Sequence, residues 1–304
     1  MSFARFMELA LYDPAVGYYR REGQRVGYAP GTDFFTASTS GPIFGELIVA
    51  AAVNLLGGRE PADYTLVEIG AESAGGVLAG VAHPFAGTRT IRLGETPALA
   101  GRCVVFSNEL FDAQPFRRFV FRDDAWRELG VGLRGEALVE IEFTPAALPA
   151  DLLPAVARDG YRIDAPLAAA ALAQQIAEQS WSGLFLTCDY GKSWRELTEA
   201  APFGTARAYF RHTQSNDLLA RPGAQDLTCH VCWDWLIDAL AREDFAAPTV
   251  ESQEAFFIHF AGPFIASTIA ATAAAFHPRK LALLQLLHPA HLGQKFQVLH
   301  AWRD

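Results

Sequence analysis

Three apolar runs that each end in polar residues constrain the fold of this chain most strongly. The runs Tyr64–Ile69, Arg102–Phe106 and Gly183–Asp189 have the length of strands and are apolar enough to be covered on both faces. Helical patterns accompany them, one from Pro42 to about Gly57 and an alanine-rich one from Asp164 to about Gln179. Strands that alternate with helices predict an α/β fold with a mostly parallel, doubly wound sheet.

Polar side chains follow each of these runs. In such sheets a ligand binds beyond the carboxyl ends of the strands, so these residues are the first candidates for a site. An acid at a strand end often only caps the next helix, but three strands that deliver acids and amides to one edge favour a ligand site. The residues are Glu68, Gly70 and Glu72 at the end of the first run, Asn108, Glu109 and Asp112 after the second, and Asp189 and Tyr190 at the third.

A glycine-rich turn follows the first run. It contains Gly70, Gly75 and Gly76, but Glu72 stands where the common GxGxxG pattern has its second glycine. A carboxylate there would repel a pyrophosphate, which disfavours NAD or FAD, whereas a sulfonium or amino group would be tolerated. The alternative is that Gly75 and Gly76 only allow close helix packing.

Composition narrows the classes of partner. The net charge is −9 and the pI is near 5.4, which argues against a nucleic-acid backbone and suits a basic protein segment. Four cysteines are too few for a disulfide scaffold. Cys229 and Cys232 flank His230, but a zinc site would need further ligands at fitting spacing, so we expect no metal.

Localisation and domain organisation are expected to be simple. The stretch Ile265–Phe276 is too short to span a bilayer and no signal peptide is evident, so we expect a soluble cytoplasmic protein with no membrane partner. We expect one domain over residues 1–304, with a helical segment at 1–58 and a Pro- and Ala-rich insertion at about 144–180. A homo-oligomer is left open.

Further strands are expected around this framework. Thr90–Leu93 is a second strand candidate of the sheet. Phe116–Phe121 and Trp126–Leu133 are typical of a strand pair joined by the charged turn at 122–124. Residues 144–165 are expected to be mainly loop.

Seven sequence blocks together resemble the MidA-like methyltransferases, a family that includes mitochondrial complex I assembly methyltransferases. They are collinear, cover essentially the whole chain and are specific as a set. The blocks are Met7–Tyr19, Thr32–Thr36, Ile43–Leu47, Ser107–Pro115, Cys188–Gly191, Pro222–Val231 and Leu287–Leu299. The resemblance implies a Rossmann-like methyltransferase that uses S-adenosylmethionine and acts on arginine in a partner protein.

The resemblance also implies roles for individual residues. Glu68 and Gly70 match the acid and the first glycine of the family's cofactor loop, and Asn108, Glu109 and Asp112 match the block after its fourth core strand. Asp33 and Thr36 match the segment that closes over the site, and Glu46 matches the helix beside it, while Asp189, Tyr190 and His230 match later blocks without an assigned role.

Two departures from the family concern the cofactor. The loop Gly70–Leu78 is longer than the family's Gly-Pro-Gly-x-Gly-Thr-Leu and lacks its second glycine. The acid that the family places at the end of the second strand, for the ribose hydroxyls, aligns near Gly94, so Glu95 could replace it only with a shift of register. Both departures are what a cofactor site falling out of use would show.

Two hypotheses follow. In the first, the chain is an active methyltransferase, and Glu109, Asp112 and Asp33 are the candidates to orient an arginine guanidinium and accept its proton. Asn108 and Glu109 could instead contact the amino group of the cofactor. In the second hypothesis the chain keeps the fold as a non-catalytic binding or assembly factor.

Overall fold

The computed structural model describes residues 1–304 except 22–26, 28–31, 34–36, 72–74, 146–151 and 273–276. The chain divides into two compact units, each built from three separate stretches. Unit 1 contains residues 1–34, 111–172 and 191–236, and unit 2 contains residues 35–110, 173–190 and 237–304. The expectation of one domain stays a prediction.

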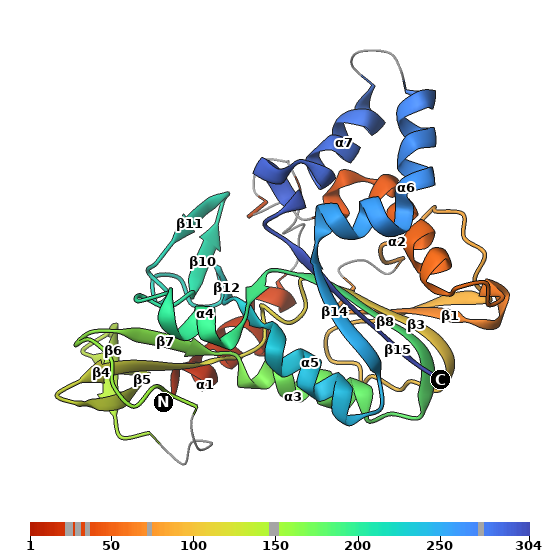
Figure 1. Ribbon diagram of the computed structural model, residues 1–304. Coiled ribbons are helices and arrows are strands. Elements are labelled where there is room, and N and C mark those ends of the chain that lie inside the picture. Colours follow the sequence, from red (N-terminus) through yellow and green to blue (C-terminus); the bar gives the residue numbers. More distant parts are fainter. Residues whose placement is uncertain (22–26, 28–31, 34–36, 72–74, 146–151, 273–276) are drawn as a thin grey trace. The chain divides into compact units, whose positions relative to one another are not determined.

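The three apolar runs form the centre of a six-stranded sheet in unit 2 (Figure 1). Its middle strands are almost wholly buried because helices cover both faces, which is why their sequences are apolar throughout. Five of the six strands run in the same direction, and the last strand of the chain, β15, is antiparallel to both of its neighbours. In order across the sheet they are β14 (Ala246–Ser252), β15 (Gln297–Arg303), β8 (Trp181–Asp189), β3 (Gly101–Asn108), β1 (Thr65–Ile69) and β2 (Gly87–Ile91).

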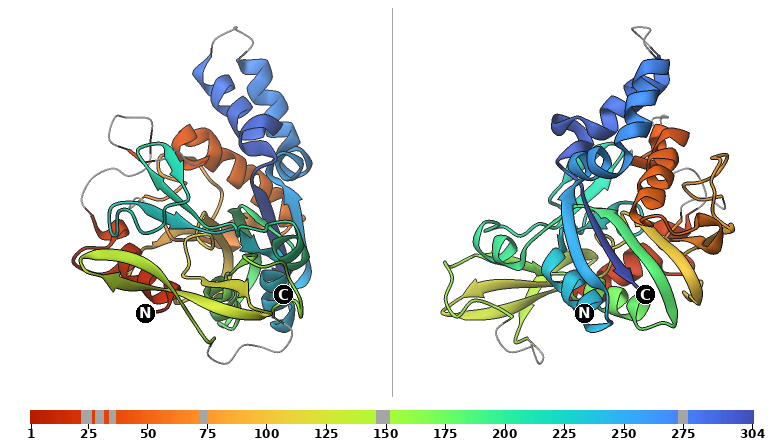
Figure 2. Two further views of the ribbon diagram at one scale, coloured as in Figure 1. Left: turned by 90° about the vertical axis from the view of Figure 1, so that its left-hand side faces the viewer. Right: turned by 45° about the vertical axis from the view of Figure 1, so that its right-hand side comes forward.

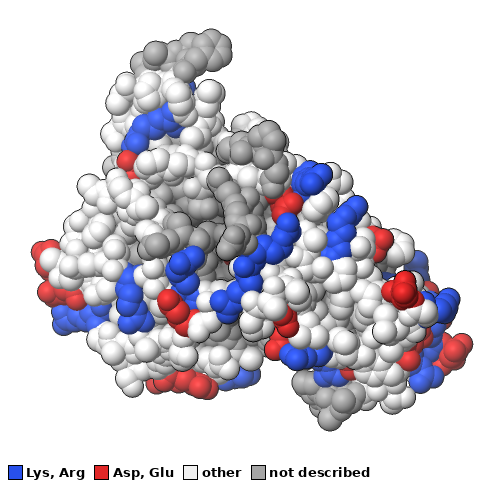
Figure 3. Space-filling model, turned by 180° about the vertical axis from the view of Figure 1, so that it is seen from behind, with Lys and Arg blue, Asp and Glu red and all other residues white. Residues whose placement is uncertain are grey.

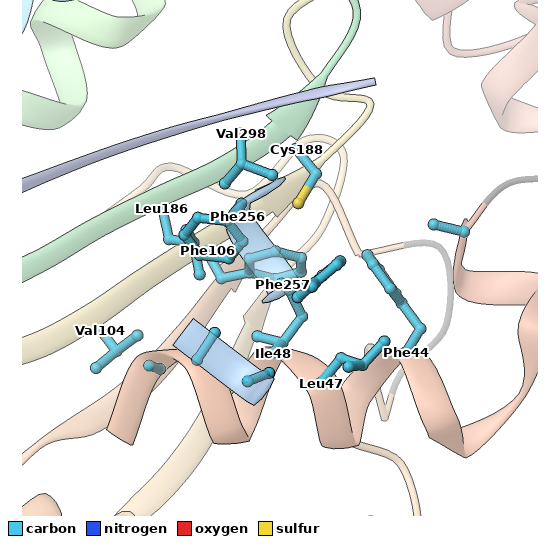
Figure 4. Packing of buried hydrophobic residues seen from close by; sticks show 14 of the residues in the cluster. Phe44, Leu47, Ile48, Val104, Phe106, Leu186, Cys188, Phe256, Phe257 and Val298 are labelled. Carbon is cyan, nitrogen blue, oxygen red and sulfur yellow. The ribbon is translucent and has the colours of Figure 1, made fainter. Parts of the chain in front are cut away.

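Helices α2 (Pro42–Leu55) and α6 (Gln253–Ala271) cover one face of this sheet. Pro42 fits the first turn of α2 because its missing N–H would have no partner there. Phe44 of α2 is fully buried, and its ring meets Phe257 of α6 at 6.2 Å and Phe106 of β3 at 6.3 Å (Figure 4). Burial of each such aromatic ring contributes about 1.5–3 kcal/mol to folding.

The other face of the sheet is covered by the unit 2 portions of α3 (Leu167–Ala177) and α5 (Trp233–Arg242) (Figures 1 and 2). Aromatic rings fill the contact, with Trp181 of β8 at 5.3 Å from Phe245. The Arg303 guanidinium lies over Phe245 and donates hydrogen bonds to the backbone oxygens of Ala177 and Gln179. Unit 2 is therefore doubly wound, as the sequence predicted.

Helix α6 is kinked, and α7 (Pro278–Leu287) pairs with it. Ala261 has non-helical angles of φ −124° and ψ 16°, two residues before Pro263, which has no N–H to donate. The two helices run side by side away from the sheet of unit 2 (Figures 1 and 2). A short π-helical turn, η4 (Pro289–Gly293), leads from α7 into β15.

Unit 1 contains a four-stranded antiparallel sheet and the helix α1 (Phe3–Tyr12). Asp123 and Asp124, both with positive φ, form the turn between two of its strands, which confirms the predicted pair. A buried ion pair between Arg118 and Asp164, 2.7 Å apart, crosses two adjacent strands. The strand order is β6 (Ala137–Phe143), β5 (Ala125–Arg134), β4 (Arg117–Arg122) and β7 (Arg162–Ala165).

Shorter elements complete both units. Helix α4 (Trp194–Glu199) begins with a capping box in which Ser193 and Glu196 satisfy each other's backbone N–H groups. The other strands form two small sheets, β11 (Thr213–Ser215), β10 (Arg207–Phe210) and β12 (Asp226–Thr228), and β13 (Val231–Cys232) with β9 (Gly191–Lys192). Short helical turns are η1 (Tyr18–Arg20), η2 (Ala37–Ser40) and η3 (Pro61–Asp63).

Two sequence-based boundaries were wrong. The second strand is β2 at Gly87–Ile91, not Thr90–Leu93, because Arg92 and Leu93 enter a turn that Glu95 closes. The stretch 144–165, expected to be mainly loop, ends in strand β7, whose Arg162–Ala165 run pairs with β4. Tertiary pairing selected a strand where the local sequence did not require one.

Candidate functional site

The four neighbouring parallel strands of unit 2 bring three of the predicted residues to one edge. Ile69 pairs with Ile91 and Ser107, and Asn108 pairs with Cys188, so the strands end nearly level. The residues that follow, Gly70, Glu109 and Asp189 among them, therefore share the carboxyl edge of the sheet. This is the edge where open α/β sheets bind ligands.

Gly70 is required by its surroundings at this edge. Its φ is +83°, and a Cβ there would lie 2.9 Å from Cδ1 of Leu110. Its N–H donates a 2.9 Å hydrogen bond to the carbonyl of Ile91, which fixes the chain as it leaves β1. The resemblance matched Gly70 to the first glycine of the family's cofactor loop, and its contribution to cofactor binding stays a prediction.

Glu68 lies two residues before Gly70 on β1 and is buried. Its Oε2 accepts a 2.5 Å hydrogen bond from the backbone N–H of Val77, so the carboxylate holds the far end of the glycine-rich loop. A Cβ on Gly76, whose φ is +60°, would overlap this carboxylate oxygen. Burial raises the pKa of Glu68 to about 7, and the hydrogen bond from Val77 only partly offsets that rise.

Asn108 and Glu109 form the most polar point of the edge. The Glu109 N–H donates to the carbonyl of Cys188 at 2.9 Å, and its φ of +50° is uncommon for a residue with a side chain. Asn108 Nδ2 donates to Glu109 Oε1 at 3.1 Å. Asn108 Oδ1 is buried and has no hydrogen-bond partner among the described residues, so it could accept one from a ligand.

Asp189 and Tyr190 lie where β8 ends. The Asp189 side chain is fully buried, and its Oδ1 accepts a hydrogen bond from the Tyr190 N–H at 2.8 Å. Burial, with the nearby charges of Asp189 and Glu109, raises the pKa of the Cys188 thiol, so this thiol stays protonated. The Tyr190 ring packs edge-on against Phe296 at 5.5 Å.

Sequence reasoning missed three residues that hold this edge in place. Ser107 Oγ donates to Thr187 Oγ1 at 2.8 Å and links the ends of β3 and β8. Gly45 of α2 lies so close to the Val77 carbonyl that a Cβ there would overlap it. Ser107 and Thr187 could have been found from the sequence, because each is a polar residue near the end of a buried strand. The close approach at Gly45 leaves no local sequence signal.

Two predicted cofactor residues of unit 2 have other partners. Both carboxylate oxygens of Glu46, on α2, contact the guanidinium of Arg279 on α7, one of them at 3.0 Å. Glu95 accepts a 2.9 Å hydrogen bond from the Arg92 N–H through Oε2 and closes the turn after β2. These contacts assign each carboxylate a structural role, and their roles in cofactor binding stay predictions.

Asp33 lies in unit 1, in a network of its own. Its two carboxylate oxygens accept hydrogen bonds from the Tyr18 hydroxyl at 2.9 Å and from the Arg211 N–H at 2.8 Å. Its carbonyl accepts from the N–H of His212 at 2.7 Å. Because Arg211 and His212 both have positive φ, Asp33 stabilises the tight turn between β10 and β11. Its predicted catalytic role is untested.

Asp112 and His230 also belong to unit 1. Asp112 is buried, and its carbonyl accepts a 3.0 Å hydrogen bond from Cys229 N–H. Burial, followed by the charges of Asp226 and Asp112, raises the pKa of Tyr12. Burial, with lesser contributions from Lys192 and Arg207, lowers the pKa of His230 to about 4, so this imidazole is neutral at neutral pH.

For three other predicted site residues the structure gives little information about ligand binding. Glu72 and Thr36 lie outside the described residues. Gly75 has no positive φ, but a Cβ there would lie 2.8 Å from Cβ of Ala79, which fits the alternative of close packing. Among the described residues no group of three or more His, Cys, Asp or Glu side chains could hold a metal ion.

The connections on either side of β2 are irregular in their described parts. The described part of residues 70–86, between β1 and β2, contains turns but no helix. Residues 92–100, between β2 and β3, contain no helix either. Parallel strands are usually joined by a crossover helix, whose N-terminus helps to bind the ligand. The β2 side of the edge lacks that support in its described part.

The described edge can accept a cationic ligand better than an anionic one. Its polar groups are the carboxylates of Glu109 and Asp189 and the unpartnered oxygen of Asn108, which attract or accept from a sulfonium, amino or guanidinium group. S-adenosylmethionine carries a sulfonium and an amino group, so these residues fit its charge. The irregular β2 side supplies no such group beyond Glu95 in its described part.

Comparison with known proteins identifies relatives over most of the chain. A family described as "putative S-adenosyl-L-methionine-dependent methyltransferase" matches residues 56–249, more than half of the chain. The mitochondrial protein arginine methyltransferase NDUFAF7 of Mus musculus is 25% identical over 300 residues, covering 78% of this chain. The same protein of Danio rerio is 24% identical over 299 residues, covering 78% of this chain.

The chain spans 65% of the length of the mouse protein and 67% of the zebrafish one. Among solved structures, a COG1565 superfamily protein from Burkholderia thailandensis bound to S-adenosyl-homocysteine is 24% identical with a TM-score of 0.87. That match covers all of this chain and 88% of the other. These matches confirm the MidA-like resemblance, the α/β fold class and S-adenosylmethionine as the cofactor of the family.

Proposed function

This chain belongs to the S-adenosyl-L-methionine-dependent methyltransferase family, and from this premise we propose that it methylates an arginine side chain of a partner protein. The relatives named as protein arginine methyltransferases support the choice of acceptor. The negative net charge supports it as well, because a −9 chain suits a basic protein segment better than a nucleic acid.

The observation that carries the proposal is the set of acceptors at the carboxyl edge of β1, β3 and β8. The Glu109 carboxylate and Asn108, whose Oδ1 is unpartnered among the described residues, belong to adjacent residues joined by a side-chain hydrogen bond, within unit 2. Such a group of acceptors suits a reaction between a sulfonium donor and a guanidinium acceptor, which both carry positive charge.

When bound, S-adenosylmethionine supplies a methyl group on a positively charged sulfur. The protein contributes alignment, because methyl transfer is an in-line displacement that needs little else. Glu109 would accept hydrogen bonds from the guanidinium, orient one nitrogen and take up the proton that this nitrogen loses as its new C–N bond forms. Asp112, three residues further along the chain, is the second candidate for the proton.

Asn108 and Glu109 also have a second possible role. They could accept hydrogen bonds from the amino group of the cofactor rather than from the substrate. The two roles make different predictions, because a cofactor contact changes the affinity for S-adenosylhomocysteine whereas a substrate contact changes only the transfer rate.

The direct test measures cofactor binding and methyl transfer separately. We expect S-adenosylhomocysteine to bind in titration calorimetry, and to stabilise the fold by about 2.7 kcal/mol at 100 times its dissociation constant. Methyl label should pass to an arginine-containing peptide and not to the same peptide with lysine. Equal labelling of both peptides would contradict arginine as the acceptor.

A second function is favoured by the irregular connections on both sides of β2. The described residues on the β2 side contain no crossover helix to contact the cofactor. Without those contacts the chain would act as a binding or assembly factor with the same fold. No binding of S-adenosylhomocysteine at millimolar concentration, by a folded protein, would support this function and contradict methyl transfer.

A further inference from the structure

The paired helices α6 and α7 expose large apolar side chains to solvent. Ile258, Ile269, Leu281 and Leu284 are between 44% and 52% exposed, and we call these four residues the apolar hairpin surface. They lie on two helices that run together away from the sheet of unit 2 (Figure 2). Several exposed large apolar side chains on two neighbouring helices are typical of a surface that a membrane or a partner protein covers.

Helix α6 is apolar well beyond the part of it that packs into the core. Its most apolar window of 18 residues has a mean hydropathy of 1.3, yet only 28% of that window is buried. By length and composition alone it could cross a membrane. The kink at Ala261 and Pro263 interrupts it, however, and a broken helix spans a bilayer poorly on its own. A helix that is apolar, exposed and kinked suits a position at an interface better.

The charge around this surface differs from that of the whole chain. No Asp or Glu occurs from Ala255 to Arg303, although the chain has a net charge of −9. Lys280 and Lys295 lie in this segment and form no ion pair among the described residues. Figure 3 shows the surface of the hairpin, at the top of the view, as mostly white, with a blue group and a small red one beside it at its base.

Two of the three acids on or beside the hairpin already hold basic partners. Glu46 pairs with Arg279, and Glu251 pairs with His259 at 2.5 Å. Glu254, in the first turn of α6, lies at the base of the hairpin next to the sheet. An approaching anionic surface would therefore meet Lys280 before it met an unpaired carboxylate.

We propose that the apolar hairpin surface docks on an anionic lipid bilayer. Its four apolar side chains enter the boundary between head groups and acyl chains, while Lys280, in the first turn of α7, faces the anionic head groups. The rest of the chain is acidic and is repelled from the same surface, which orients the protein. A second copy of the chain that docked through its own hairpin would present a segment without Asp or Glu from Ala255 onward and would give Lys280 no opposite charge.

This proposal differs from the expectation that the chain has no membrane partner. That expectation considered only whether Ile265–Phe276 could span a bilayer. Docking in the interface needs an exposed apolar face with adjacent cations and does not need a span. It is also separate from the proposed methyl transfer, because none of the four apolar residues or Lys280 is assigned a part in that reaction.

Flotation with lipid vesicles tests the proposal. We expect binding to vesicles of about 70% phosphatidylcholine and 30% phosphatidylserine, and weaker binding to pure phosphatidylcholine. Combined replacement of Ile269, Leu281 and Leu284 by serine should weaken binding at least about tenfold. Leu133→Ser is the matched control, because Leu133 is 72% exposed on β5 of the other unit, and it should change binding less than about twofold.

The lysine contribution is tested on the same two kinds of vesicle. Lys280→Gln should weaken binding to anionic vesicles about fivefold, which corresponds to the roughly 1 kcal/mol of one cation near such a surface, and leave neutral vesicles unaffected. Melting temperatures within a few degrees of the wild type would show that every variant folds.

Two results would overturn the proposal. One is the absence of vesicle binding, or binding that the triple serine variant retains in full. The other is a dimer in light scattering that the triple variant dissociates while vesicles bind neither protein, because the surface would then be covered by a second copy. Binding lost only in Leu133→Ser would place the contact on the other unit and would also contradict it.

Discussion

The two halves of the carboxyl edge in unit 2 differ in how well they are built. On the β3 and β8 side, a hydroxyl pair, a backbone bond from Glu109 and an unpartnered Asn108 oxygen form an ordered set of polar groups. On the β2 side, irregular connections without a described helix lead into and out of the strand. A methyl donor bound here would be held mainly at the end where chemistry occurs.

A cofactor site usually has to do two things, to act on the reacting atoms and to hold the rest of the cofactor, and the two halves of this edge differ in which of these they can do. Groups that act on the reacting atoms can be kept while groups that only hold the remote part of the cofactor are reduced. Binding energy from remote contacts normally supports alignment at the reacting centre. We therefore expect weak affinity for the cofactor while the acceptor side stays intact.

The largest effect is expected from Glu109→Gln on the well-built side. Loss of a carboxylate that orients the acceptor and takes up its proton should reduce the methyl transfer rate by at least about 100-fold. Glutamine keeps the shape and can still contact Asn108, so the fold and the affinity for S-adenosylhomocysteine should change little. A tenfold loss of that affinity would instead assign Glu109 to the cofactor.

Gly76→Ala should give the next largest effect, on the stability of the fold. A Cβ there overlaps the buried Glu68 carboxylate, and the positive φ adds strain, so the free energy of unfolding should fall by about 3 kcal/mol. Gly80→Ala is the matched control, because φ is +73° there and nothing lies within 4 Å of the added Cβ. It should cost only about 1 kcal/mol. Equal losses would remove the special role of Gly76.

Glu68 should make the free energy of unfolding depend on pH. Burial raises its folded pKa from 4.5 to about 7, so the folded state holds a proton that the unfolded state releases between these values. Its contribution to stability is present below pH 4.5 and is lost as the pH rises through about 7, a change of up to about 3 kcal/mol.

Glu68→Gln cannot titrate, so the difference in unfolding free energy between wild type and variant should shift in favour of the variant as the pH rises from 5 to 8. Chemical denaturation at a series of pH values measures this difference. A difference that is independent of pH would mean that the carboxyl is more hydrated than its burial indicates.

Glu95→Gln should have the smallest effect. Its carboxylate closes the turn after β2 by accepting from Arg92 N–H, and the residue is exposed, so stability should fall by less than about 1 kcal/mol. Affinity for S-adenosylhomocysteine should change less than about threefold if the β2 side contributes little. A tenfold loss of affinity would show that Glu95 does take the place of the missing ribose acid.

The sequence predicted the well-built side better than the other. Buried strands that end in polar residues have a local signature, so the pattern of the chain alone placed Gly70, Asn108 and Asp189 at one edge. The resemblance to a family then supplied the cofactor. Both signals are strong where the chain keeps the pattern of its relatives.

The remaining features depend on contacts between distant segments. Nothing local to Gly45 or Gly76 shows that a carbonyl or a carboxylate presses against it. Glu46 and Asp33 are polar residues within family blocks, yet their described contacts are an ion pair to α7 and hydrogen bonds to a turn. The strand β2 was misplaced because a turn with its own side-chain cap displaced it. Such partners cannot be read from spacing.

Hydrogen–deuterium exchange with and without S-adenosylhomocysteine tests the unequal construction of the edge most directly, because it reports each half separately. We predict slower exchange in peptides that contain residues 67–71 and 107–110 when the ligand is added, with little change in residues 92–97. Protection confined to residues 92–97, or no protection in either half from a ligand that binds, would contradict it.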